Sequence, residues 1–290
     1  GRDAYRYIHD ETLRLANHGL TPREIAEQVE FPDSLAKHWS VRSYYGTVSH
    51  NVKSTYTRYL GWYDGNPANL EPLVPVESGK RYVEFMGGAD NVISKARESF
   101  EKGEYRWVAE VLGHVVFADP ANQEARELQA DAFEQLGYQT ESSTWRNAYL
   151  MGAQELRHGT PSFPIGGTAS EDSIRAMTLP MIFNFFAIKI HGVDAADLEL
   201  DVNLDITDTG ESAVLRLSNG VLSHSMTDRD EDAPVLEMSR ELLNKLVGNE
   251  ITLEEAVEAG EVEAGPGLEV FRKFGEHLDE FDLWFPIIEP

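Results

Sequence analysis

The chain has 290 residues, no cysteine and a formal net charge of −25 at pH 7. This length predicts two domains that each bury a core, and the lack of cysteine excludes disulfides, thiolate metal sites and thiol nucleophiles. The acidity disfavours binding to nucleic acid and to anionic membrane surfaces, because like charges repel.

The first twenty residues are polar and amphipathic and lack the basic start and apolar stretch of a secretory signal, so the compartment stays open. The next residues, Thr21 to Glu24, fit a capping box, which predicts a short helix after a first helix over residues 3–19. Residues 44–63 are rich in aromatic side chains and are expected to form an ordered loop, followed by a turn at Asp64-Gly-Asn-Pro-Ala68.

Four consecutive helices are expected in the rest of the first half, over residues 92–101, 105–117, 122–136 and 141–156. Small and large residues alternate there as in a tetratricopeptide unit. Because repeat proteins usually need about three units to stand alone, this module is expected to bury its open face elsewhere, for example on another subunit.

The two halves differ in charge. Residues 1–160 hold 17 basic and 23 acidic residues, a charge of −6, and the remaining residues carry −19. The segment between them, residues 158–167, contains two prolines and three glycines, which end helices and permit turns. We therefore predict a helical domain over residues 1–160 and a second domain over residues 165–290.

The second half predicts an α+β domain with an antiparallel sheet. Residues 177–190 are apolar but contain Asn184 and Lys189 and fall short of the ~20 residues that span a bilayer, so they predict a buried helix and no membrane span. Strands are expected over residues 198–206, 213–217 and 221–225, with a fourth over 235–238. Helices follow over 240–247, 253–258 and from residue 267.

No motif of local catalytic chemistry is present. The nine histidines are all more than four residues apart, so the local spacing typical of zinc ligands is missing, although ligands could still converge from distant positions. The sequence also lacks a phosphate-binding glycine-rich loop, a Gly-x-Ser-x-Gly elbow and a dinucleotide fingerprint.

Hydrogen-bond donors gather in the segment Tyr45 to Leu70. Several charged or neutral donors in a partly dry segment can bind a sulfate or a carboxylate. The alternative is that its tyrosines and Trp62 anchor the core and that Arg58 pairs with an acid. The donors are His50, Asn51, Lys53, Tyr56, Arg58 and Tyr59.

Four segments, residues 5–17, 45–70, 81–90 and 281–287, together resemble the linear alkylsulfatases of the metallo-β-lactamase superfamily, the type that hydrolyses dodecyl sulfate. The run Gly61-Trp-Tyr-Asp-Gly-Asn-Pro-Ala-Asn69 is the most specific of these likenesses. The resemblance implies an order of three domains: a zinc hydrolase domain, a helical dimerisation domain and a domain similar to sterol carrier proteins. The present sequence resembles the second and third.

The resemblance implies that the dinuclear zinc ligands lie in the hydrolase domain, so this chain alone is expected to bind no zinc and to be inactive. It implies a homodimer through residues 1–160, with the hydrolase domain as a further partner. The substrate sulfate is expected to contact Tyr56, with Arg58 and His50 behind it and with Asn51 and Trp62 as further candidates.

A sterol-carrier-like domain implies an apolar tunnel for an alkyl chain. Because the second domain is strongly acidic, it should accept a fatty alcohol more readily than an intact alkyl sulfate. Two alternatives stay open, an ordinary helix packed on a sheet and a stand-alone lipid-binding or adaptor protein without catalysis. The expected tunnel residues are Met177, Met181, Phe183, Phe185, Phe186 and Ile188.

Overall fold

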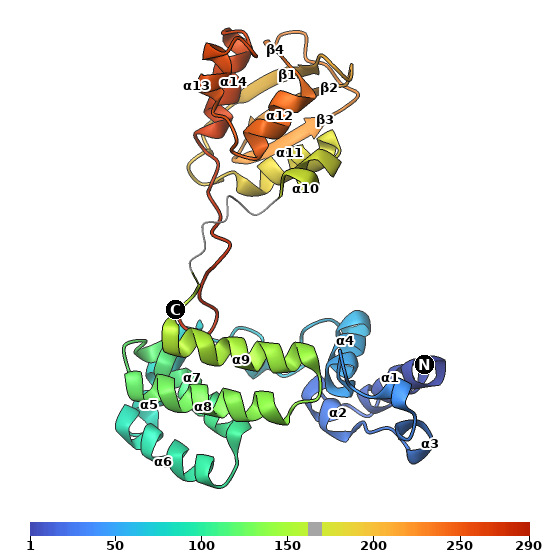
Figure 1. The fold of residues 1–290 in the computed structure, drawn as a ribbon, viewed down its shortest axis with the longest axis vertical. Helices are drawn as coiled ribbons and strands as arrows, with labels where there is room; N and C mark the ends of the chain where they lie inside the picture. Colours follow the sequence, from blue (N-terminus) through green and yellow to red (C-terminus); the bar gives the residue numbers. More distant parts are fainter. Residues whose placement is uncertain (162–169) are drawn as a thin grey trace. The chain divides into compact units, whose positions relative to one another are not determined.

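The computed structural model describes residues 1–161 and 170–290, which fall into two compact units (Figure 1). The helical unit comprises Gly1–Pro161 and Pro286–Pro290, and the mixed unit comprises Ser162–Phe285. The mixed unit therefore lies, in sequence, between two parts of the helical unit. The predicted second domain, residues 165–290, assigns Pro286–Pro290 to the mixed unit, whereas in the structure they belong to the helical unit. The predicted boundary segment 158–167 lies partly outside the described residues.

The helices of the helical unit follow one another with short connections. They are α1 (Arg2–Ala16), α2 (Pro22–Gln28), α3 (Asp33–Ala36), η1 (Trp39–Val41), α4 (Val48–Leu60), η2 (Pro67–Asn69), α5 (Pro75–Phe85), α6 (Ala89–Glu101), α7 (Tyr105–Ala118), α8 (Gln123–Gln139) and α9 (Ser143–His158).

Two hydrophobic clusters stabilise this unit. In the first, α1 and α2 pack on α4, and in the second α6 packs on α7, α7 on α8 and α8 on α9. The four helices predicted between residues 92 and 156 are confirmed as α6 to α9, with ends that differ by at most three residues. Each packs on its neighbour in sequence, as the helix-hairpin pattern indicated.

The expected loop over residues 44–63 is wrong, because α4 occupies most of it. The side chain of Thr47 accepts a hydrogen bond from the backbone N–H of His50 and so caps the helix. Val48, Val52 and Tyr56 then follow at one-turn spacing and pack in the first cluster. The aromatic residues obscured this apolar stripe at the sequence level.

The mixed unit combines a four-stranded sheet with five helices among its described residues. They are α10 (Glu171–Ala176), α11 (Leu179–Lys189), β1 (Leu200–Ile206), β2 (Ser212–Ser218), β3 (Val221–Ser225), β4 (Val235–Met238), α12 (Arg240–Val247), α13 (Leu253–Glu258) and α14 (Pro266–Gly275). The sheet order is β3-β2-β1-β4, with α11 on β3 and α14 on β1 and β4. Val202, Leu204 and Ile206 alternate into the core, as the predicted strand requires.

The sheet is mixed rather than wholly antiparallel. The pairs β1–β2 and β2–β3 are antiparallel, but β4 runs parallel to β1. The chain between β3 and β4 has to cross from one edge of the sheet to the other. Asn203 holds this crossing by donating to the carbonyls of Asp230 and Ala233 and accepting from the backbone N–H of Asp230, while Arg229 pairs with Asp205.

Among the helices of residues 1–161 and 170–290, none is long and apolar enough to cross a membrane. The predicted apolar helix is α11, which buries Leu179, Ile182 and Phe183, while Met181 and Ile188 are exposed. It is therefore amphipathic in the fold even though its sequence is apolar almost throughout.

Candidate functional site

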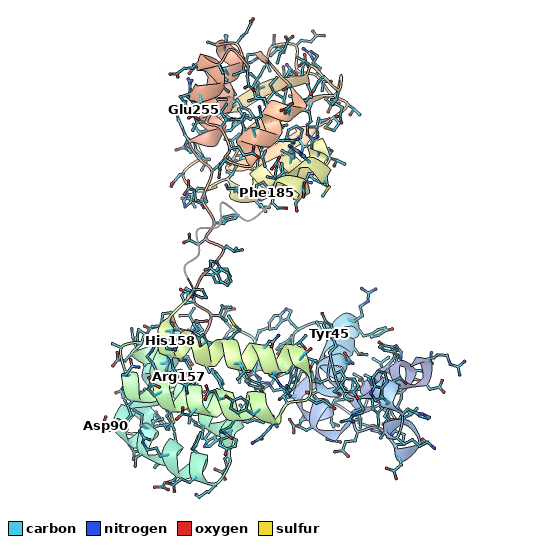
Figure 2. All side chains as sticks on the ribbon, in the orientation of Figure 1. Tyr45, Asp90, Arg157, His158, Phe185 and Glu255 are labelled. Carbon is cyan, nitrogen blue, oxygen red and sulfur yellow. The ribbon has the colours of Figure 1, made fainter. Side chains whose placement is uncertain are left out.

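The segment with the predicted donors is held against the start of α9. The carbonyl of Tyr45, labelled in Figure 2, accepts hydrogen bonds from the hydroxyls of Ser142 and Thr144, and the carbonyl of Tyr44 accepts from the backbone N–H of Ser143. These bonds fix the chain immediately before α4. The donor side chains of α4 are thus carried by a rigid helix rather than by a loop.

His50 contacts a residue that the sequence did not place near it. The indole N–H of Trp145 donates to His50 Nδ1, and the two rings meet edge to face with centroids 5.0 Å apart. Because an indole can only donate, His50 Nδ1 accepts, and the proton of the neutral ring then lies on Nε2. Lys53 lies 5.9 Å above the same indole. The structure therefore brings His50, Lys53 and Trp145 together.

Tyr56 lies on the buried face of α4. Its side chain is 7% exposed and packs with Ile8, Ile25 and Val52. For this residue the structure shows the core anchor that the sequence left open as the alternative. Tyr59 is exposed, and its hydroxyl lies 2.9 Å from His9 Nε2.

The other predicted residues are exposed and separate. Among the described residues Arg58 has no hydrogen-bond or ion-pair partner, so the expected pairing with an acid is not found there. It is eight residues from His50, about 12 Å along the helix axis. Asn51 is exposed on α4, and Trp62 is exposed beyond the helix and tilted against Tyr63.

The turn after α4 is the predicted one. The Asp64 carboxylate accepts from the backbone N–H of Asn66 at 2.9 Å and from the Asn69 side chain at 2.6 Å. These two bonds, the backbone one first, hold the pKa of Asp64 below its ordinary value. The Asp-Gly-Asn-Pro run thus forms a turn that the Asp64 carboxylate holds by hydrogen bonds, and the exposed Trp62 lies two residues before it.

A polar cavity of about 690 Å³ opens between α2, α4, α5 and α7. Its side chains include Arg23, Lys53, Arg106, Glu27, Glu110 and His114. Arg106 and Glu27 form an ion pair at 2.8 Å, and burial lowers the pKa of His114. Apart from Lys53, sequence reasoning missed these residues, because they come from α2 and α7, and the Arg106–Glu27 pair spans 79 positions of the sequence.

The mixed unit contains an apolar cavity of about 340 Å³, a size typical of ligand sites. Leucine and phenylalanine side chains of β2, β3 and all helices from α11 to α14 line it, including Leu215, Leu222 and Phe271. Of the residues expected to line a tunnel, Phe186 is the one among the lining side chains. Its one basic lining residue, Arg272, is paired with Glu254 at 3.2 Å and with Glu269 at 2.6 Å.

The described residues do not offer a metal site. No group of three or more histidine, aspartate or glutamate side chains in residues 1–161 and 170–290 is placed to hold an ion. These residues therefore do not fit the zinc centre that the family resemblance implies.

Comparison with protein families gives two matches. Residues 21–159 match the model described as alkyl sulfatase dimerisation, and residues 167–290 match the model described as alkyl sulfatase C-terminal. The first match falls in the helical unit. The second covers the mixed unit and the returning segment.

Individual relatives agree with these matches. The chain is 50% identical to a linear primary-alkylsulfatase of a Pseudomonas species and 45% identical to the alkyl/aryl-sulfatase BDS1 of Saccharomyces cerevisiae, over its whole length in both cases. It spans 43% and 44% of these relatives. The structure of the stereoselective inverting sec-alkylsulfatase Pisa1 from Pseudomonas superposes with a TM-score of 0.93 at 43% identity, covering all of this chain and 46% of that one.

Proposed function

The chain belongs to the alkylsulfatase family, and we propose that it is the dimerisation and alkyl-chain-binding portion of an enzyme that hydrolyses linear alkyl sulfate esters such as dodecyl sulfate. The observation that carries this proposal is the pair of family matches, which between them cover residues 21–159 and 167–290. The zinc of the reaction would belong to a separate hydrolase domain, since the described residues do not supply its ligands.

The helical unit supplies the side chains for the sulfate end of the substrate in this proposal. Arg58 is exposed and without an ionic partner among the described residues, and His50 can donate through Nε2. Both can approach an anion from the exposed face of α4. Tyr56 would act by holding the helix against the core.

The mixed unit takes the other end of the substrate. Its apolar cavity suits an alkyl chain, and the charge of Arg272 at the lining is already compensated by two carboxylates. An uncharged hydroxyl is therefore accommodated better than a sulfate. We infer that the cavity binds the released fatty alcohol, and that sterol-carrier-like binding is the role of this unit.

The test of the catalytic proposal is reconstitution. The purified, zinc-loaded chain should release no sulfate from dodecyl sulfate, and a separately expressed alkylsulfatase hydrolase domain added to it should gain activity. In the reconstituted mixture Arg58→Ala should lower kcat/KM by about tenfold or more, whereas Arg97→Ala, which removes another exposed arginine, should not. Failure of the chain to raise the activity of the hydrolase domain, or equal effects of the two variants, would contradict the proposal.

The alkyl-chain proposal predicts a dependence on chain length. Each CH₂ buried contributes about 0.8 kcal/mol, so two additional carbons in a fatty alcohol should tighten Kd by about tenfold until the chain outgrows the cavity. Gly275 lines the cavity and has open space around it, so Gly275→Leu should weaken binding, while Gly265→Leu, equally open but outside the lining, should not. Calorimetry with octanol, decanol and dodecanol measures this, and an affinity independent of chain length would contradict it.

A stand-alone lipid-binding protein is the second candidate, because the apolar cavity serves it equally well. The two candidates differ in the reconstitution experiment. Alcohol binding combined with no effect on the hydrolase domain would favour the second.

A further inference from the structure

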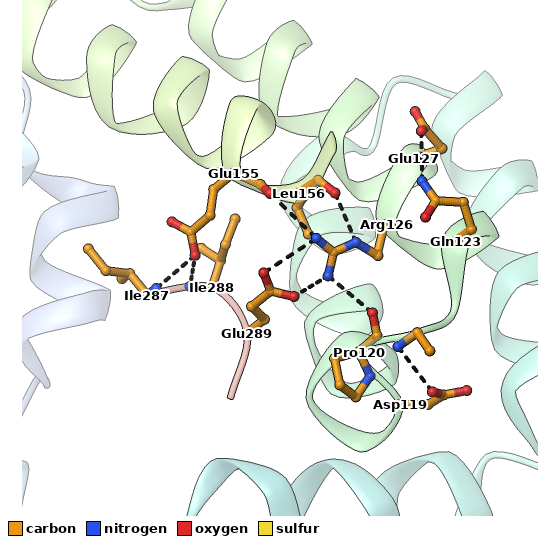
Figure 3. A network of polar contacts seen from close by, with 11 residues as sticks. Asp119, Pro120, Gln123, Arg126, Glu127, Glu155, Leu156, Ile287, Ile288 and Glu289 are labelled. Carbon is orange, nitrogen blue, oxygen red and sulfur yellow. Dashed lines mark hydrogen bonds and ion pairs between the residues drawn. The ribbon is translucent and has the colours of Figure 1, made fainter. Parts of the chain in front are cut away.

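We propose that the helical unit carries a recognition site for a short acidic and apolar peptide, and that the chain's own segment Pro286–Pro290 occupies it here. This segment belongs to the helical unit although it follows the mixed unit in sequence. Figure 3 shows that it lies along the end of α9, next to Arg126 of α8. The site binds one carboxylate, two backbone N–H groups and one apolar side chain of the segment.

Arg126 binds the carboxylate of Glu289. Its guanidinium forms a two-pronged ion pair with Glu289, and the two side chains are 11% and 17% exposed. A two-pronged contact of this kind fixes the direction as well as the charge of its partner. A neutral side chain at position 289 would leave a nearly buried cation without compensation, which is costly.

Arg126 is held in place by groups that do not belong to the segment. It donates to the carbonyl of Leu156 at 2.8 Å, to that of Pro120 at 3.1 Å and to that of Glu155 at 3.4 Å. These carbonyls come from the last turn of α9 and the connection between α7 and α8. The guanidinium is thus preorganised for a carboxylate before the segment arrives, which distinguishes a binding site from a chance contact.

Glu155 binds the backbone of the segment. One of its carboxylate oxygens accepts from the backbone N–H of Ile287 at 2.7 Å and from that of Ile288 at 3.1 Å. The residues on either side, Pro286 and Pro290, have no N–H to satisfy. Of the three backbone N–H groups between the two prolines, the two of Ile287 and Ile288 therefore bind to the Glu155 side chain.

The apolar side chain is that of Ile288. It packs against the second cluster of the helical unit, beside Phe133, in the space left open by Gly152. The neighbouring Ile287 is 71% exposed. The site should therefore discriminate between two adjacent isoleucines, which gives a matched pair of variants.

The first test is hydrogen exchange in the full chain, followed in a fragment that spans residues 285–290. The amides of Ile287 and Ile288 should exchange at least about tenfold more slowly than in a free peptide of the same sequence. Ile288→Ser, Glu289→Gln and Arg126→Gln should each remove this protection, and Ile287→Ser should retain it. Exchange at the free-peptide rate in the unaltered chain, or equal effects of the two isoleucine variants, would overturn the proposal.

The second test asks whether the site binds the peptide in trans. The receptor is the full chain with Ile288→Ser and Glu289→Gln, which weakens its own segment, and the probe is a fluorescent peptide Phe-Pro-Ile-Ile-Glu-Pro. Saturable binding that is at least about tenfold weaker with Arg126→Gln supports the proposal. Unchanged exchange of the α6 and α7 amides shows that the receptor with Arg126→Gln is folded. A folded receptor with Arg126 intact that binds no peptide would overturn the proposal.

Discussion

Arg157 illustrates how single residues tie the helices of the acidic helical unit together. Labelled on α9 in Figure 2, it pairs with Asp131 and Glu134 at 2.6 Å and with Glu127 at 3.3 Å, all on α8. Its hydrogen bond to Glu134 is the main cause of a raised guanidinium pKa. One cation therefore compensates three carboxylates on the neighbouring helix.

Removing this cation should destabilise the helical unit. Arg157→Ala leaves three acids facing one another, and because Arg157 is partly buried we expect a loss of about 1–2 kcal/mol in the free energy of unfolding. Arg97→Ala, which removes an exposed pair with Glu124, should cost less than about 0.5 kcal/mol. Urea unfolding of both variants measures the difference, and equal losses would contradict the cluster's role.

His114 is a residue whose surroundings fix its charge. It stacks on Tyr82 with ring centroids 4.3 Å apart, and burial lowers its pKa from the ordinary 6.5, opposed by the nearby Glu110 carboxylate. Arg23, Lys53 and Arg106 line the same cavity. The folded unit therefore favours the neutral ring.

The lowered pKa predicts how stability depends on pH. The unfolded chain binds a proton at His114 more readily than the folded chain, so protonation of His114 favours unfolding. The contribution of the neutral ring to the free energy of unfolding is therefore complete above about pH 6.5 and is lost as the pH falls through the folded pKa. NMR titration of the His114 ring should give a pKa below 6.5, and Glu110→Gln should lower it further. A value at or above 6.5 would contradict the burial argument.

Helix contacts depend on where small residues lie. Gly79 of α5 sits against α7, and a Cβ there would meet the carbonyl oxygen of His114 at 2.6 Å and the backbone nitrogen of Ala118 at 3.2 Å. Gly113 of α7 differs, since a Cβ there meets only the Gln129 side chain at 3.4 Å. The backbones of α5 and α7 therefore approach closely at Gly79, whereas Gly113 of α7 faces only a side chain of α8.

This difference predicts opposite results for the same substitution. Gly79→Ala should destabilise the helical unit by about 1–3 kcal/mol, because two backbones have to separate. Gly113→Ala should be neutral or stabilising by up to about 1 kcal/mol, as expected for alanine within a helix. Thermal unfolding compares them, and a neutral Gly79→Ala would show that the helices separate at little cost.

At the scale of the whole molecule, the helical unit has a group of exposed apolar side chains on α5 and on the segment before it. A group of exposed apolar side chains of this kind is typical of a protein interface. Since the unit matches a dimerisation domain, we expect this surface to contribute to the proposed homodimer. Its members are Leu70, Leu73, Val74, Tyr82 and Phe85, the last of which is 92% exposed.

A charge on this surface should weaken the dimer. Phe85→Asp is expected to raise the dissociation constant by at least about tenfold, because exposed aromatic side chains often dominate interfaces and the chain already carries a charge of −25. Val193→Asp alters another exposed apolar residue, in the mixed unit, and should leave the dissociation constant unchanged. Sedimentation equilibrium measures both constants, and a monomeric unaltered chain would refute the proposed dimer itself.

The sequence by itself determined the features that local pattern encodes. Helical periodicity located α6 to α9, strict alternation located β1, and the Thr21–Glu24 capping box marked the start of α2, which the structure confirms. The segments resembling alkylsulfatases also sufficed to identify the family, which the comparisons confirm. The periodicity, the alternation and the capping box each depend on residues within about one or two turns or one strand of each other.

Tertiary structure decided everything that depends on residues distant in sequence. Only packing shows that Tyr56 faces the core, that Trp145 binds His50 from 95 positions away, that β4 lies parallel to β1 and that Glu289 returns to Arg126. A periodic pattern specifies that a face is buried but not against which partner. That partner is fixed by the long-range packing of complementary surfaces, which the local sequence does not contain.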